Sequence, residues 1–357
     1  MKDIKNFSLD ELKSYFTSIG EPSYRANEVF RAIYIQKVRE FSSITTLPKK
    51  LREQLSKEFF IRSFQKVSTI GEKTGTQKFL FKLRDGKLIE TVLIKEKNSS
   101  GRKRNTLCIS SQVGCAMGCK FCATGNMGFI RNLTTGEIIE QLLYVEDYEK
   151  ITNIVFMGMG EPLANYENVV KAIKIISDEN GRALGRRKIV ISTSGIIPKI
   201  YQLATDLKSV KLAVSLHSAI QEKRDFLMPG LRTYKIKDLA KSLSYHSKKT
   251  GNTITVEYLL IRNINDSLED LNVLVKFLKE IKFVKVNLIH YNPVPFSNFK
   301  PSEKENEFFK ILKTNKINVT IRYSKGTEIS AACGQLATKN RVLEQEFRIF
   351  KNLSKRS

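Results

Sequence analysis

Three cysteines stand close together in the segment Cys115-Ala-Met-Gly-Cys119-Lys-Phe-Cys122. Thiolates in a glycine-containing loop can converge on one metal centre, and thiolate ligands select zinc, copper(I) or iron–sulfur clusters. A structural zinc site is normally closed by four protein ligands, and this loop holds no fourth Cys or His. Three thiolates would leave one iron of a 4Fe–4S cluster without a protein ligand. The spacing therefore favours such a cluster, with zinc as the alternative.

A glycine-rich turn, Gly158-Met-Gly-Glu-Pro162, directly follows an apolar run. Gly158 and Gly160 permit a ligand to approach the backbone closely, and the carboxylate of Glu161 is an acceptor suited to an ammonium group. Glycine turns after strands are also common structural devices. The position of this turn after the three-cysteine loop favours a binding site.

Two further cysteines lie outside the three-cysteine loop. Cys108 lies in an apolar run seven residues before Cys115, and Cys333 lies in Ser330-Ala-Ala-Cys-Gly-Gln335. The small neighbours of Cys333 and the following Gly334 predict a tight turn with an accessible thiol. For either cysteine taken alone, a buried and unreactive thiol is the ordinary interpretation.

From about residue 105 the chain alternates between apolar runs, which predict strands, and amphipathic stretches, which predict helices. Strands are expected near residues 106–110, 152–157, 188–192, 210–215, 253–261, 284–289 and 317–322. Helices are expected near residues 134–147, 166–178, 197–206, 236–249, 267–281 and 303–314. The pattern predicts an α/β fold with a parallel sheet and helices outside it, as a complete or partial barrel or a doubly wound sheet. In a barrel, the active site lies at the carboxyl ends of the strands, where the unusual turns fall.

The chain divides into four expected regions: a helical domain at 1–60, a β-hairpin linker region at 61–100, the core at 101–336 and a basic C-terminal helix at 337–357. In the first region, Ser8 and Glu11 predict a capping box at the start of a helix. In the second, Asp85-Gly86 favours a hairpin with a type I′ turn.

The charge of the chain points to a polyanionic partner. Its 357 residues include 61 Lys and Arg against 36 Asp and Glu, for a net charge of +25. Nucleic-acid affinity comes largely from neutralised phosphates, although an AT-rich coding bias is the plainer source of such a charge. No apolar run is long enough to cross a bilayer, and the first residues are charged where a signal peptide would be apolar. We therefore expect no membrane partner and a cytoplasmic protein with reduced cysteines.

Five segments, in the same order along the chain, together resemble the RlmN family of radical S-adenosylmethionine (SAM) RNA methyltransferases, with its relative Cfr. They are Cys108-Ile-Ser-Ser-Gln-Val-Gly-Cys115, Phe156-Met-Gly-Met-Gly-Glu-Pro-Leu-Ala-Asn165, Ser192-Thr-Ser-Gly195, Ser215-Leu-His217 and Ala331-Ala-Cys-Gly-Gln-Leu336. The resemblance spans residues 21 to about 338. It implies a partial (β/α) TIM-like barrel of the radical SAM type, with the N-terminal helical domain as an RNA-binding accessory unit.

The resemblance implies methylation at C2 of adenosine, an electron-poor carbon that does not attack an electrophilic methyl group. In the family, two SAM molecules act in each turnover, and Cys333 takes the methyl group of the first. A 4Fe–4S cluster on Cys115, Cys119 and Cys122 cleaves the second SAM to a 5′-deoxyadenosyl radical, which abstracts hydrogen from the S-methyl group. The resulting carbon radical adds to C2. Attack by Cys108 then releases the methylated base and leaves a Cys108–Cys333 disulfide, which must be reduced before the next turnover.

Other residues take their roles from the same resemblance. Glu90, in Lys87-Leu-Ile-Glu-Thr-Val-Leu-Ile94, matches the family's candidate base for the C2 proton. The SAM-binding residues would be Gly160, Glu161, Ser192, Ser215, Leu216, His217 and Asn292. His217 and Asn292 each have a plainer interpretation as turn residues.

The implied substrates are 23S ribosomal RNA and the adenosine beside the tRNA anticodon. The implied electron donor is a flavodoxin or ferredoxin system, and the protein is expected to be a monomer. Pro162 is similar to the C2-methylating members, whereas C8-methylating resistance relatives tend to carry alanine there. C8 methylation of the Cfr type, which confers resistance to ribosome-targeting antibiotics, and a noncatalytic zinc-dependent RNA-binding protein are the alternatives.

Overall fold

The computed structural model describes residues 1–73, 75–97, 101–323 and 325–337. The core contains a run of parallel strands in which each strand pairs with the next along the sequence. These strands are β6 (Lys103–Cys108), β9 (Asn153–Phe156), β10 (Ile189–Thr193), β11 (Lys211–Ser215), β12 (Ile254–Leu260), β13 (Val284–His290) and β14 (Asn318–Arg322). The expected basic helix at 337–357 lies outside the described residues, apart from Ala337.

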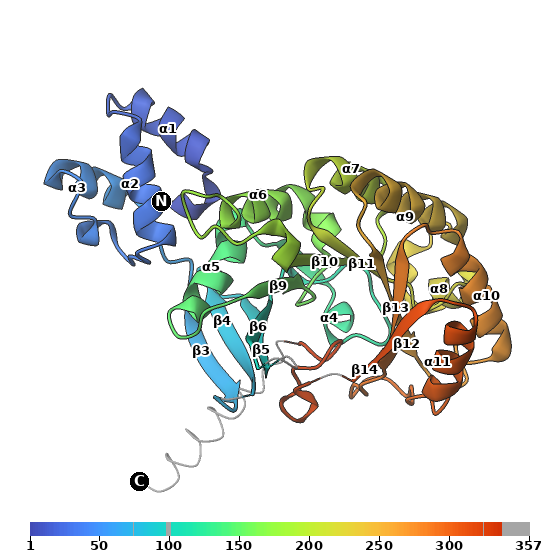
Figure 1. Ribbon diagram of the computed structural model, residues 1–357. Helices are drawn as coiled ribbons and strands as arrows, with labels where there is room; N and C mark the ends of the chain where they lie inside the picture. The colour runs from blue at the N-terminus through green and yellow to red at the C-terminus, as the bar shows by residue number, and fades with distance from the viewer. Residues whose placement is uncertain (74, 98–100, 324, 338–357) are drawn as a thin grey trace, which may run out of the picture.

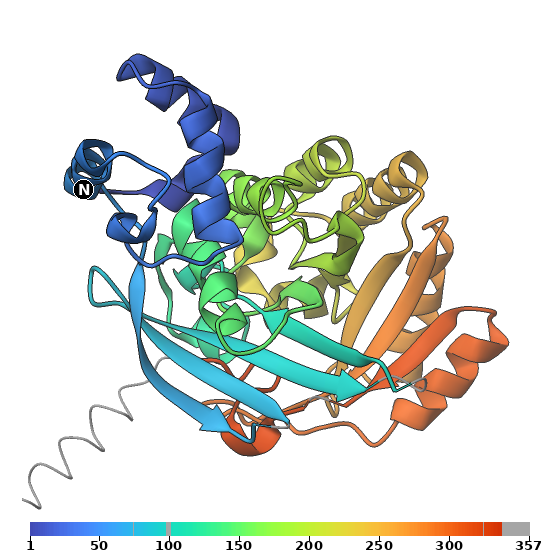
Figure 2. The ribbon, with the colours of Figure 1, turned by 60° about the vertical axis from the view of Figure 1, so that its left-hand side comes forward.

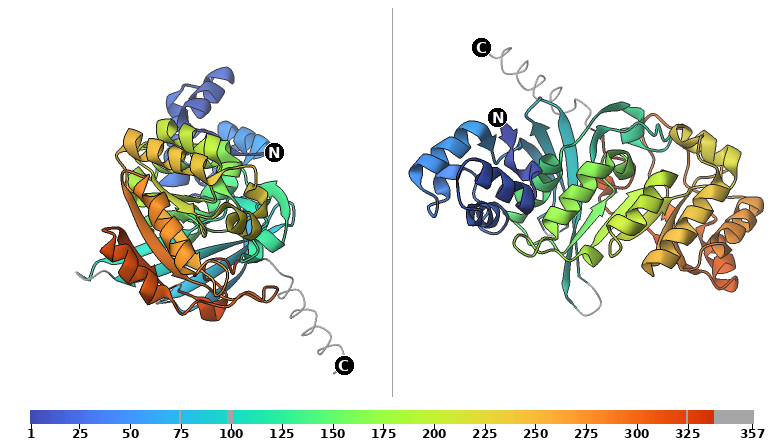
Figure 3. Two further views of the ribbon diagram at one scale, coloured as in Figure 1. Left: turned by 90° about the vertical axis from the view of Figure 1, so that its right-hand side faces the viewer. Right: turned by 90° about the horizontal axis from the view of Figure 1, so that it is seen from above.

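Amphipathic helices follow the parallel strands and lie on the outer side of the sheet (Figures 1 and 3). They are α5 (Thr135–Glu146), α6 (Tyr166–Ile176), α7 (Ile197–Asp206), α9 (Ile236–Thr250), α10 (Leu268–Lys279) and α11 (Glu305–Thr314). Capping boxes begin two of them, at Thr134 with Glu137 and at Ser267 with Asp270, since each pair satisfies backbone donors that the first turn leaves free. The alternation predicted from the sequence is confirmed here to within a few residues at each end.

Three antiparallel strands extend the same sheet beyond β6 (Figure 2). They are β3 (Phe64–Gly71), β4 (Thr76–Leu83) and β5 (Leu88–Lys97). The last of them pairs with β6, with Val92 opposite Cys108. The strands β3, β4 and β5 therefore continue the barrel sheet. Among the described residues the sheet has ten strands, in the order β14-β13-β12-β11-β10-β9-β6-β5-β4-β3. Its two edges do not pair with each other, so the barrel is partial, as expected.

The turn between β4 and β5 differs from the expected type. Leu83 donates its N–H to the carbonyl of Lys87, and Gly86 donates to the carbonyl of Leu83. Gly86 has φ of 81°, whereas Asp85 is not in the left-handed region. A type I′ turn needs positive φ at both central residues, so the prediction of that turn type was wrong. The loop is one residue longer, and only its glycine takes the left-handed conformation.

The N-terminal region holds α1 (Leu9–Ser18), α2 (Tyr24–Tyr34) and α3 (Lys49–Glu58), with the predicted capping box at Ser8. Two short strands, β1 (Lys2–Asp3) and β2 (Phe59–Phe60), bring its two ends together. A buried ion-pair network then fastens it to α5. The Lys5 ammonium lies 2.9 Å from Asp3 and 3.0 Å from Glu140, and Arg62 lies 2.8 Å from Glu140. In Figure 1 these helices project from the barrel beside α5 and α6.

Replacing Glu140 by Ala should lower the free energy of unfolding by about 3 kcal/mol, because it leaves two cations short of a buried partner. Urea denaturation followed by circular dichroism measures this. Glu167→Ala is the matched control, since Glu167 is 80% exposed and pairs with Lys199 at 3.5 Å, so its loss should cost less than about 1 kcal/mol. Equal destabilisation by the two substitutions would contradict the anchoring role of the network.

Four short elements that sequence patterns did not predict surround the three-cysteine loop. They are β7 (Gln112–Gly114), α4 (Ala123–Asn126), β8 (Phe129–Asn132) and α8 (Gln221–Leu227). Each is too short to give a periodic signal. No helix in the described part of the chain is both long and apolar enough to span a membrane.

Candidate active site

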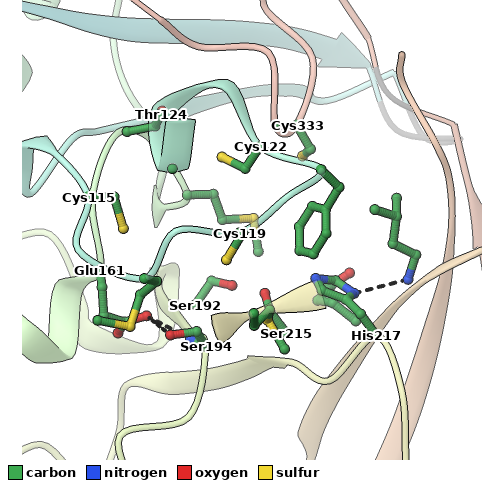
Figure 4. Close-up of a pocket in the computed structure, with 18 of the residues that line it drawn as sticks. Cys115, Cys119, Cys122, Thr124, Glu161, Ser192, Ser194, Ser215, His217 and Cys333 are labelled. Atoms are coloured by element: carbon green, nitrogen blue, oxygen red, sulfur yellow. Dashed lines mark hydrogen bonds between the residues drawn. The ribbon is translucent and has the colours of Figure 1, made fainter. Parts of the chain in front are cut away.

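One pocket gathers most of the predicted site residues at the carboxyl ends of the parallel strands, as expected for a barrel (Figure 4). Its lining includes the three clustered cysteines, the glycine-rich turn and small polar residues from the ends of β10 and β11. The predicted residues that line it are Cys115, Cys119, Cys122, Gly160, Glu161, Ser192, Ser215, His217 and Cys333.

The three-cysteine loop is held by backbone hydrogen bonds from two sides. Cys115 donates to the carbonyl of Gly128 beside β8, at 2.9 Å. On the other side, Lys120 donates to Leu227 at the end of α8, and Gly230 donates to Met117, both at 3.0 Å. The short elements β8 and α8 therefore fix the loop, which explains why they surround it.

The three clustered thiols face one space. In Figure 4 the sulfur atoms of Cys115, Cys119 and Cys122 point into the same pocket. Among the described residues, however, no three His, Cys, Asp or Glu side chains lie close enough together to hold one ion. In a cluster each thiolate binds a different iron, so the thiols need to face one space without meeting at one point. A set of three thiols that face one space therefore fits an iron–sulfur cluster.

Glu161 is fixed at the pocket wall by hydrogen bonds to both carboxylate oxygens. Thr193 Oγ1 and Leu163 N–H donate to Oε1 at 2.7 and 2.9 Å. Ser194 donates to Oε2 from its backbone N–H at 2.7 Å and from its hydroxyl at 2.6 Å. Burial raises the pKa of this carboxyl, and these hydrogen bonds oppose that rise. Gly160 has φ of 97°, and a Cβ there would lie 2.4 Å from the side chain of Gln112, so only glycine fits.

His217 presents a neutral imidazole to the pocket. Its Nδ1 accepts the backbone N–H of Leu259 at 3.1 Å, which leaves the ring hydrogen on Nε2. Burial lowers the pKa of His217 to about 3, and the ring packs edge-on against Phe121. Asn265 donates from its side chain to the carbonyl of His217 and so supports its left-handed φ of 56°. The donor that the His217 ring can offer is therefore the Nε2–H.

Two predicted SAM-binding residues do not line this pocket. Leu216 is completely buried behind it. Asn292 donates from its side-chain amide to the carbonyl of Cys333 at 3.3 Å, so in this structure it supports the Cys333 loop.

The loop that carries Cys333 is tied to the segment after Cys122. Ala123 donates its N–H to the carbonyl of Gly334 at 2.7 Å, and the Thr124 hydroxyl donates to Leu336 at 2.6 Å. Gly334 has φ of 82°, which agrees with the tight turn expected at this position. The Cys333 thiol thereby lies beside the cysteine loop (Figure 4).

Cys108 and Cys333 face a second, small cavity together. Cys333 therefore borders both this cavity and the larger pocket. Arg322 also lines both spaces, and its guanidinium lies close enough to interact with both thiols. Burial and the neighbouring Cys333 raise the pKa of the Cys108 thiol to about 12. Both cysteines are free thiols in this structure.

Glu90 faces a third pocket, which adjoins the loop that carries Cys333. This pocket is lined by Ser330, Gln335 and Ala337 of that loop as well as by Glu90. Glu90 is only 5% exposed and lies 3.1 Å from the Lys78 ammonium. Burial raises the pKa of its carboxyl, while Lys78 opposes the rise.

Two buried charged residues at the site were missed from the sequence. Arg224, in α8, donates to the carbonyl of Ser194, whose N–H and hydroxyl hold Glu161. Glu257, in β12, lines the pocket of the three clustered cysteines and accepts a hydrogen bond from Asn287 at 3.0 Å. A lone charge inside the apolar strand Ile254–Leu260 was a usable signal for Glu257. Arg224 gave none, because its helix is short and otherwise ordinary.

Comparisons with known proteins agree with this geometry. The profile of the Radical SAM superfamily matches residues 109–278, and that of the ribosomal RNA large subunit methyltransferase N-terminal domain matches residues 2–61. A "Dual-specificity RNA methyltransferase RlmN" of Geotalea uraniireducens is 44% identical, covering 94% of this chain and 96% of its own. A "Probable dual-specificity RNA methyltransferase RlmN" of Dictyoglomus turgidum is 46% identical, covering 94% of this chain and 97% of its own.

A solved structure is also similar over nearly the whole chain. The crystal structure of a radical SAM methyltransferase from Sphaerobacter thermophilus has a TM-score of 0.88 at 40% identity, and the match covers 95% of this chain and 100% of that one. Membership of the superfamily implies a 4Fe–4S cluster and SAM as cofactors, which the donor set in the pocket fits. The chain belongs to the RlmN family of radical SAM RNA methyltransferases.

Proposed function

We propose that this protein methylates C2 of adenosine in 23S ribosomal RNA and in tRNA, through a methyl group carried on Cys333. The names of its relatives support two RNA substrates. The observation that carries the proposal is the position of Cys333, which borders both the pocket of the three clustered cysteines and the cavity of Cys108. A carrier thiol must reach a cofactor on one side and a resolving thiol on the other.

The pocket lined by the three clustered cysteines would hold both cofactors. Cys115, Cys119 and Cys122 would bind the cluster, and Glu161 and His217 would bind SAM with the small residues around them. Gly160, Ser192 and Ser215 are the small residues that line the pocket beside them. Leu216 and Asn292 do not line the pocket and would support the SAM site indirectly. When bound, these groups would supply the methyl group and the radical that activates it, and the cluster would also take back the one electron that the radical adduct must lose. The protein's own part is to keep the carrier thiol beside them.

The remaining steps use the chain's own side chains. With the Cys333 sulfur joined to C2 through a CH₂ bridge, the C2 proton would pass to the Glu90 carboxylate. The Cys108 thiolate would then attack the Cys333 sulfur, forming an S–S bond and breaking the S–CH₂ bond. The released carbon takes up a proton and becomes the methyl group.

The third pocket is the proposed place for the adenine base. Its apolar wall includes Leu80, Met127, Val294 and Phe296, and Glu90 supplies a carboxylate within it. A base in folded RNA must be unstacked to enter such a space, and apolar and aromatic side chains then take the place of its stacking neighbours. We propose that the N-terminal region, residues 1–60, contacts the RNA around this base. A flavodoxin or ferredoxin system would supply electrons to a monomer acting in the cytoplasm.

Mass spectrometry of nucleosides tests the proposal. The anaerobically reconstituted protein is incubated with SAM, a reductant, and either unmodified 23S ribosomal RNA or tRNA. The expected product is 2-methyladenosine in both RNAs. Methylation at C8 would contradict the assigned position, and an unmethylated tRNA would contradict the second substrate.

A further inference from the structure

We propose that Lys78 is a positioning residue whose ammonium keeps Glu90 ionised and ties it to the loop that carries Cys333. This inference rests on the proposed function, because it concerns Glu90 as the acceptor of the C2 proton.

Lys78 contacts both Glu90 and the loop that carries Cys333. Its ammonium lies 3.1 Å from Oε1 of Glu90 and 3.1 Å from the carbonyl of Ser330. Lys78 lies on β4 opposite Val92 of β5, and Leu80 lies opposite Glu90, so the ion pair crosses diagonally between neighbouring strands. Lys78 is 9% exposed and Glu90 is 5% exposed. Solvent therefore screens this pair much less than a surface pair.

Besides Glu90, two charged side chains line this pocket among the described residues. Lys78, from β4, is the one cation among the described residues that line this pocket. Glu328, from the 3-10 turn Thr327–Ile329, also lines the pocket, and its charge would disfavour an ionised Glu90. The backbone N–H of Ala337 donates a hydrogen bond to Oε2 of Glu90 at 2.9 Å. The Ser110 hydroxyl, just after β6, donates to the backbone carbonyl of Glu90 and not to its carboxylate.

Removing the ammonium should therefore raise the pKa of the Glu90 carboxyl and leave less of it ionised at a given pH. Burial raises the pKa of Glu90, and both the charge and the hydrogen bond of Lys78 lower it. A neutral carboxyl cannot accept the C2 proton. The step concerned is one proton transfer, in which the C2–H bond breaks and the proton moves to the Glu90 oxygen beside the ammonium. The hydrogen bond to the Ser330 carbonyl holds the Lys78 ammonium against the loop that carries Cys333. Because Glu90 pairs with the same ammonium, Glu90 is also held close to that loop.

The test is the pH dependence of single-turnover methylation by full-length reconstituted protein. Lys78→Met and Lys78→Gln remove the charge, and Gln keeps a hydrogen-bond donor; Lys78→Arg keeps the charge. In both uncharged variants, the rising limb of the rate against pH should move upward by about one pH unit, and the rate below it should fall about tenfold. Raising the pH should restore the rate. Lys78→Arg should resemble the unaltered protein.

Methylation of Cys333 and the iron content separate this role from a structural one, and neither should change in the variants. An unchanged pH profile in either uncharged variant that retains Cys333 methylation would overturn the role of Lys78. Glu90→Gln tests the underlying function separately, because that variant should accumulate the RNA adduct. If Glu90→Gln turned over normally, the base assignment would fail. If it trapped the adduct while the Lys78 variants kept the original profile, only the inference about Lys78 would fail.

Discussion

Replacing Cys333 by Ala should abolish methyl transfer to RNA, with a loss of at least about 10³-fold, while the iron content and absorption of the cluster stay unchanged. The reason is that a thioether on this sulfur is the only proposed route by which the methyl group reaches C2. Cys333 lines the pocket of Cys115, Cys119 and Cys122 from a separate loop, so these three cysteines should keep their backbone supports in the variant. Nucleoside mass spectrometry and iron analysis of the reconstituted variant measure the two expectations.

Thr327→Ala is the matched control for this substitution, because Thr327 is an exposed residue a few positions earlier in the same segment. It should keep its activity. Methylated adenosine from the Cys333→Ala protein would rule out this residue as the carrier.

Replacing Cys108 by Ala should trap RNA covalently on the protein. Cys108 and Cys333 face one cavity, and in the proposed mechanism the Cys108 thiol attacks the carrier sulfur and frees the adenine base. Without it, the CH₂ bridge has no resolving nucleophile and the adduct should accumulate to most of the reconstituted protein. Denaturing gel electrophoresis with labelled RNA detects the adduct as a band of low mobility.

The double variant Cys108→Ala with Cys333→Ala is the control, and it should form no adduct because the carrier is absent. Normal turnover by the single variant, with only free RNA recovered, would defeat the resolving role. An adduct in the double variant would place the attachment on another residue.

Much of the barrel was predictable because its strands are apolar runs and its helices have a regular amphipathic period. The position of β3, β4 and β5 in this sheet was not predictable. It depends on the pairing of Val92 with Cys108, and no local sequence pattern encodes that contact. The turn at Asp85-Gly86 was misassigned because the same dipeptide fits two loop lengths, and the register of the flanking strands decides between them.

The candidate site was predictable where its residues occupy turns after strands. Gly160, Glu161, Ser192, Ser215 and His217 all reached one pocket for that reason. The residues that hold the site in place were harder to predict. Arg224 and Lys78 are buried charges whose partners, Ser194 and Glu90, are distant in sequence. Asn292 likewise contacts the Cys333 loop, which no pattern in its own turn could indicate.

The most direct measurement is the mass of the peptide containing Cys333 after the reconstituted protein has met SAM with a deuterated methyl group. The account predicts a labelled methyl thioether on Cys333, and the appearance of that label in adenosine once RNA and reductant are added. A protein that methylates adenosine while this peptide stays unlabelled throughout would contradict the account.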